Sequence, residues 1–140
     1  MPDLSDYNSS LLWISILIAM IMVQWLIASG RKAKQPGALP GTPPTNQSHA
    51  DFTFRAWRTH QNSLENASTM LGAGFFAILA GANPAWVSGL LAIMVVARIA
   101  HMVLYYSIAT DKNPSPRSYF FLIAWLANAG LLICGFVALF

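Results

Sequence analysis

Three apolar runs, each about as long as a membrane-spanning helix, constrain the fold of this chain most. They cover residues 11–29, 85–109 and 119–140, and the last contains no charged residue. A helix needs roughly 20 mostly apolar residues to cross about 30 Å of hydrocarbon. Only 9% of the 140 residues are charged, whereas soluble domains carry about 25%. The sequence therefore predicts an integral membrane protein.

A fourth helix is expected between the first two runs. Residues 67–82 are apolar but too short to span alone, and residues 52–66 extend them into a long helix with a polar first half. Prolines and glycines in residues 30–50 and 81–84 and a polar segment at 111–116 mark the connections. We expect one all-α domain over residues 1–140, a four-helix transmembrane bundle with spans near 11–29, 52–82, 85–109 and 118–140.

The placement of the cations predicts the orientation in the membrane. All 8 Lys and Arg lie in the 30–50 and 110–117 loops or in helix segments that open onto them. The opposite side would hold both termini with Asp3 and Asp6. Under the positive-inside rule the Pro-rich 30–50 loop is cytoplasmic and both termini are extracytoplasmic. The first run has no basic segment before it, so we expect a retained span rather than a cleaved signal peptide.

Two of the expected helices carry a stripe of polar side chains. At about 100° per residue the stripe of the second helix fills an arc of about 80°, and that of the third is similarly narrow. The stripes consist of Arg55, Arg58, Asn62 and Glu65, and of Arg98, His101 and Tyr105. Ionisable residues in spans nearly always face a bundle interior or a wet cavity. We therefore expect Arg58, Glu65 and Arg98 to meet between helices.

The polar stripes have two interpretations. Interhelical contacts of this kind can simply lock helix packing, or the same groups can form a ligand site. The single cysteine and the spacing of histidines and acids favour neither a disulfide framework nor a metal site. The cations do not form the exposed basic stripe of a nucleic-acid-binding protein. A small-molecule site and purely structural contacts both remain open.

Residues 55–66, RAWRTHQNSLEN, resemble the R-x-x-R-A-H-x-N-x-x-E-N signature of the MAPEG family, the membrane-associated proteins in eicosanoid and glutathione metabolism. Residues 97–101, followed by Tyr105, are similar to the family's A-R-x-x-H-x-x-x-Y stretch. Arg117, after the Pro-rich segment 113–116, matches a basic residue that opens the family's fourth helix. The resemblance covers about residues 52–140 and is closest to the branch of microsomal glutathione transferases and prostaglandin E synthases.

This resemblance implies a homotrimer of four-helix protomers, with glutathione as co-substrate held between neighbouring subunits near the cytoplasmic side. It places Arg117 and Ser118 at the thiol as catalytic residues. The residues that it implies for glutathione binding are Arg31, Arg58, Asn62, Glu65, Arg98, His101 and Tyr105. His101 and Arg31 either contact the ligand or only pack.

Two departures from the family pattern concern the reaction. Phe121 stands four residues after Arg117, where the prostaglandin synthase has a tyrosine. The loop between Tyr105 and Arg117 is also a few residues longer than in that enzyme. Both departures argue against prostaglandin synthesis and towards a general glutathione transferase.

The chemistry of glutathione fits this set of residues. Its two carboxylates suit the planar guanidinium groups of Arg58, Arg98 and Arg31, and its ammonium suits Glu65. Its thiol needs a cation such as Arg117, because only the thiolate is a good nucleophile. We expect a transferase or peroxidase acting on lipophilic electrophiles or lipid hydroperoxides that arrive from the membrane lipids. A non-catalytic glutathione- or lipid-binding protein and a structural membrane partner are the alternatives, and in these Arg117 would only anchor its helix to lipid headgroups.

Overall fold

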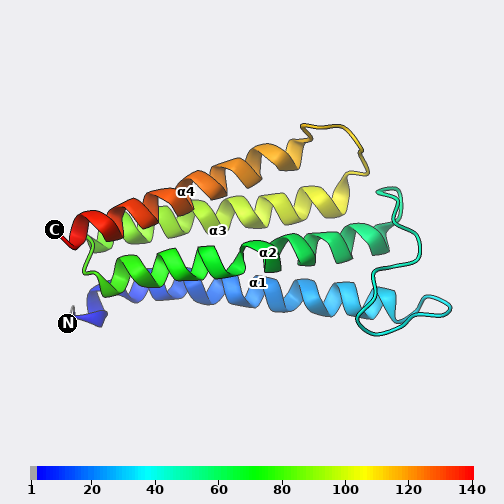
Figure 1. Cartoon of the computed structure of the whole chain (residues 1–140), viewed down its shortest axis with the longest axis horizontal. Helices are drawn as coiled ribbons and strands as arrows, with labels where there is room; N and C mark the ends of the chain where they lie inside the picture. The colour runs from blue at the N-terminus through cyan, green and yellow to red at the C-terminus, as the bar shows by residue number, and fades with distance from the viewer. Residues whose placement is uncertain (1–2) are drawn as a thin grey trace.

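The computed structural model describes residues 3–140 as four long helices packed side by side (Figure 1). A short 3-10 helix, η1 (Leu4–Tyr7), leads into α1 (Asn8–Lys32), which is followed by α2 (Phe52–Leu79), α3 (Pro84–Ser107) and α4 (Pro116–Ala138). The predicted all-α, four-helix architecture is confirmed. Three helical segments are long and apolar enough to cross a membrane: Leu4–Lys32, α3 and α4. The polar first half of α2 keeps that helix out of this set, although α2 lies alongside the others.

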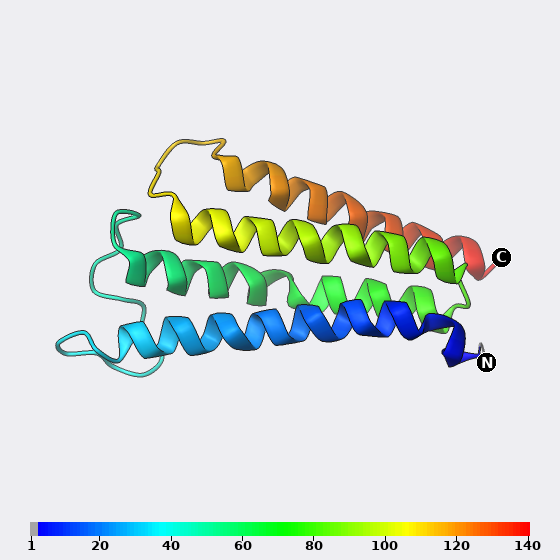
Figure 2. The ribbon, with the colours of Figure 1, turned by 180° about the vertical axis from the view of Figure 1, so that it is seen from behind.

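Both described ends of the chain and the α2–α3 turn lie at one end of the bundle (Figures 1 and 2). The α1–α2 and α3–α4 loops lie together at the other end. The α2–α3 turn is short because Gly81, with φ +76°, closes α2 in a Schellman motif: Ala82 N–H donates to Ala77 C=O, and Gly81 N–H to Ile78 C=O. Asn83 then caps α3 through its side chain, and Pro84 occupies the first turn.

The termini end of the bundle is closely packed and apolar. Leu17 of α1, Leu91 and Met94 of α3 and Leu131 of α4 are fully buried there. Gly135 lets α4 approach α2, because a Cβ at this position would lie 2.5 Å from two ring carbons of Phe76 and 3.3 Å from the Ala77 Cα. The polar side chains lie instead towards the opposite end of the bundle, which carries the two long loops.

Gly135→Ala should destabilise the bundle, because the added methyl group cannot be accommodated without moving Phe76 and the α2 backbone. Overpacking of this kind costs about 1–3 kcal/mol, which thermal unfolding in detergent would detect. Gly89→Ala is the matched control, since Gly89 is a helical glycine with no heavy atom within 4 Å of the place that an added Cβ would occupy. Equal melting temperatures of the two variants would contradict the close α2–α4 contact.

Candidate functional site

Polar side chains from α2, α3 and α4 line a hollow near the loop end of the bundle. The hollow has a volume of about 200 Å³ and is lined by Arg58, Asn62, His101, Tyr105, Arg117, Ser118 and Phe121. Six of these residues are among the site residues predicted from the sequence. The structure thus brings together residues 58 and 118, which are widely separated along the chain, in one place.

Arg58 and Glu65 form a two-pronged ion pair along α2. Arg58 Nη1 donates to Glu65 Oε1 at 3.0 Å and Nη2 donates to Oε2 at 3.2 Å. The Arg58 side chain remains 34% exposed and the Glu65 side chain 55% exposed on the surface of the single chain. Because a charged group exposed to lipid is costly, this face of α2 requires water, a ligand or another protein chain against it.

Arg98 is the most deeply buried charge, with 2% of its surface exposed. Its Nη2 donates to Ser63 Oγ at 2.9 Å, and its guanidinium lies 5.8 Å from the centre of the Phe121 ring. Within residues 3–140 no carboxylate pairs with Arg98, so the expectation that Glu65 meets Arg98 was wrong. Glu65 pairs with Arg58 on its own helix, and Ser63, two residues before Glu65, contacts Arg98 of α3 instead.

Arg117, in the first turn of α4, covers the ring of Tyr105. Its guanidinium carbon is 4.0 Å from the ring centre, and its nitrogens approach Thr110 C=O at a long 3.5 Å. No carboxylate in the described part of the chain pairs with this arginine. His101 is buried beneath, with its ring 5.7 Å from that of Tyr105. The hollow therefore offers a cation at a helix N-terminus, an arrangement that favours an anion.

Two predicted residues have local roles outside or at the edge of this arrangement. Ser118 closes a capping box at the start of α4: its Oγ accepts from the Ser115 backbone N–H at 3.1 Å. Arg31 lies outside the hollow, where its guanidinium is 5.0 Å from the centre of the Phe52 ring. Within one protomer, Arg31 is thus not part of the site.

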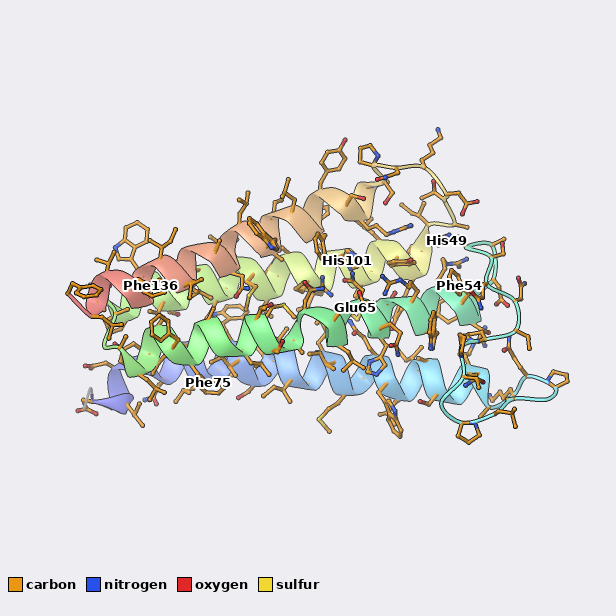
Figure 3. All side chains as sticks on the ribbon, viewed as in Figure 1. His49, Phe54, Glu65, Phe75, His101 and Phe136 are labelled. Carbon is orange, nitrogen blue, oxygen red and sulfur yellow. The ribbon has the colours of Figure 1, made fainter. Side chains whose placement is uncertain are left out.

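His49, which the sequence analysis did not single out, lies at the loop end of the bundle (Figure 3), next to two residues that line the hollow, Tyr105 and Arg117. It comes from the α1–α2 loop, and its ring contacts Tyr105, Arg117 and Asp111. No motif or helical periodicity marks this residue, because its place is set by how the loop folds back over α3. Only the tertiary structure reveals it.

A comparison with known protein families identifies the family of this chain. The model of the MAPEG family matches residues 10–137. The chain belongs to the MAPEG family. The match extends over α1 as well as the motif-bearing helices. No curated protein and no solved structure gives a significant match to the chain.

MAPEG membership makes this chain an integral membrane helical bundle related to glutathione or eicosanoid metabolism. The three apolar segments agree with membership of a family of membrane proteins. Over residues 3–140 no three His, Cys, Asp or Glu side chains gather where they could hold a metal ion. The guanidinium groups of Arg58 and Arg117 in the hollow favour an anion.

Ser63→Ala should destabilise the protein, because it removes the side chain that accepts a hydrogen bond from the buried Arg98. Loss of a hydrogen bond to a charged group costs about 1–3 kcal/mol. Ser68→Ala, on the exposed surface of the same helix, is the matched control. Thermal unfolding of both variants in detergent would test this, and a melting temperature of Ser63→Ala as high as that of the control would contradict it.

Proposed function

We propose that this protein is a membrane-bound glutathione transferase or peroxidase. It would stabilise the thiolate of glutathione for attack on a lipophilic electrophile or for reduction of a lipid hydroperoxide. The observation that carries the proposal is the hollow in which Arg117, without a carboxylate partner among the described residues, lies over Tyr105 beside Arg58, Asn62 and His101. Family membership supports glutathione as the co-substrate.

The charges around the hollow match those of glutathione. On binding, Arg58 would exchange its contact with Glu65 for a carboxylate of glutathione, which would leave Glu65 for the ammonium, while Arg98 lies deeper in the bundle as a second guanidinium. Asn62 adds amide hydrogen-bonding groups, and its Oδ1 has no partner within the described chain. A thiol with an ordinary pKa of about 8.5 is mostly protonated at neutral pH, and a neighbouring cation lowers that pKa. Arg117 and the N-terminus of α4 would supply this stabilisation.

A path for a lipophilic second substrate continues from the hollow along the face between α2 and α4. Phe121 lines both the hollow and a small gap beside Arg98, and Trp125 and Asn128 line both this gap and a groove of about 340 Å³. The rest of the groove is formed mainly by small and apolar residues: Thr69, Gly72, Ala73, Ala129 and Leu132. In the trimer proposed next, this groove would lie at the boundary between two subunits, and a substrate dissolved in the bilayer could enter along that boundary to reach the thiolate.

We further propose a homotrimer with the glutathione site near the cytoplasmic side. A neighbouring copy would cover the half-exposed Arg58–Glu65 pair, and Arg31 of that copy would complete the set of arginines. The loop end of the bundle carries the cations of both loops, so the positive-inside rule favours a cytoplasmic loop end and extracytoplasmic termini.

The purified protein should conjugate glutathione to members of a panel of lipophilic electrophiles or reduce lipid hydroperoxides with it.

Arg117→Ala should slow turnover about tenfold or more at neutral pH, because one unit of thiol pKa is worth about 1.4 kcal/mol. The affinity of the Arg117→Ala variant for glutathione should change much less than its turnover. Raising the pH should partly restore turnover, since more of the thiol then ionises without help.

Arg117→Lys is the matched variant, because it keeps the charge but not the planar guanidinium. Turnover between that of the wild type and of Arg117→Ala would agree with stabilisation of the thiolate by charge. Wild-type turnover in Arg117→Ala would contradict the assignment. Glutathione binding without thiolate absorbance and without turnover in the wild type would instead indicate the non-catalytic binding protein.

The oligomer can be tested through the α2–α4 face. Native mass spectrometry in mild detergent should give the mass of three chains. Thr69→Trp, on that face, should shift the population towards monomers, whereas Ile93→Trp, on the exposed apolar surface of α3, should leave it unchanged. Only monomers in the wild type, or equal behaviour of the two variants, would contradict the proposed assembly.

A further inference from the structure

His49 connects both loops at the bundle end to the proposed thiol site (Figure 3). Its Nδ1 lies 2.8 Å from Asp111 Oδ1 in the α3–α4 loop, and its Nε2 lies 3.0 Å from the Tyr105 hydroxyl. Arg117 Nη2 is 3.5 Å from the same Nε2. Although His49 is a loop residue, only 25% of its side chain is exposed. The ring is thus placed against two of the residues that line the hollow.

The orientation of the His49 ring is fixed by α2. Arg55 Nη1 donates to the backbone C=O of His49 at 2.6 Å, while Arg55 Nη2 donates to Tyr106 C=O at 3.3 Å. The ring edge also contacts Phe54, with 5.1 Å between ring centres. Arg55 therefore ties the loop backbone at His49 to α3, and Phe54 packs against the imidazole that faces Tyr105.

The partners of His49 determine which of its nitrogens carries the proton. An ionised carboxylate only accepts hydrogen bonds, so the Nδ1 that faces Asp111 carries the hydrogen. In the neutral ring Nε2 is then an acceptor, and the Tyr105 hydroxyl donates to it. Asp111 orients the imidazole and would stabilise its protonated form, as a carboxylate does for histidine bases in general.

We propose that His49 accepts the proton of the glutathione thiol through the hydroxyl of Tyr105. This inference rests on the proposed function. The S–H bond of the thiol breaks as an O–H bond forms at Tyr105, and the original O–H bond of Tyr105 breaks as an N–H bond forms at His49 Nε2. The products are a thiolate beside Arg117, a neutral Tyr105 and an imidazolium beside Asp111.

The charges around His49 make this transfer depend on the thiolate. Asp111 favours the imidazolium, whereas the guanidinium groups of Arg117 and Arg55 disfavour it; Tyr105 is neutral and Phe54 is apolar. A thiolate beside Arg117 offsets the positive charge of that guanidinium at the moment when His49 becomes charged. The side chain of Asp111 is 85% exposed, so the proton can pass from this pair to water and regenerate the neutral ring.

The relay can be tested by following the formation of the bound thiolate by its ultraviolet absorbance after rapid mixing with glutathione. His49→Gln keeps a hydrogen-bond acceptor for Tyr105 but cannot take up a proton. It should slow thiolate formation about tenfold or more, within the range of general-base effects, with little change in glutathione affinity. Imidazole in the buffer should restore part of the rate in His49→Ala. Lys112→Ala, in the exposed α3–α4 loop, is the control and should behave like the wild type.

Each outcome separates the relay from the proposed function. Thiolate formation at the wild-type rate in His49→Gln would overturn the relay and leave the transferase proposal standing. An equal loss of glutathione affinity and rate, without imidazole rescue, would show that His49 only holds the loop. A wild-type protein that forms no thiolate and turns over no electrophile would overturn the proposed function itself. If His49→Gln does not fold, Asp111→Asn keeps the imidazole and should also slow thiolate formation; a wild-type rate there would overturn the relay.

Discussion

The burial of Arg98 is the constraint on which the polar half of this bundle depends. A guanidinium at 2% exposure needs hydrogen-bond acceptors or aromatic faces around it, because burying an unpaired charge is expensive. Ser63 of α2 supplies a hydrogen-bond acceptor. Phe121 of α4 supplies an aromatic face. α2, α3 and α4 must therefore pack in one register, with Ser63, Arg98 and Phe121 at the same level along the bundle. That register is what places Arg58, Tyr105 and Arg117 around a single hollow.

Much of the fold followed from simple periodicities in the sequence. The apolar runs predicted the helices, and the narrow arcs of polar residues predicted that α2 and α3 would turn one face towards each other. Arg58, Asn62, His101 and Tyr105 meet as expected because helical geometry fixes which residues share a face. Gly81, Asn83 and Pro84 likewise specify the α2–α3 turn through their local conformational preferences. These features depend on residues that are close in the sequence.

The parts that could not be predicted depend on contacts between distant segments. Nothing near Ser63 indicates that it, rather than Glu65, would bond Arg98; the choice depends on the rotation of α2 against α3. His49 lies in a loop without a motif, and its contact with Tyr105 spans 56 positions along the chain. The family resemblance implied a role for Arg31 in glutathione binding, yet within the described chain its guanidinium lies over the Phe52 ring. A pattern read along one chain gives no position for a residue whose proposed role depends on another copy.

The tight α2–α3 turn has a consequence for how the protein enters a membrane. α2 is too polar in its first half to be a favourable span alone, whereas α3 is strongly apolar. The Schellman motif at the end of α2 and the N-cap of α3 leave only a short turn between the two helices. We therefore expect the insertion of α2 to be coupled to that of α3, so that the two helices enter the bilayer together as a hairpin. Lengthening this turn would weaken that coupling during biogenesis even where the folded bundle tolerates the insertion.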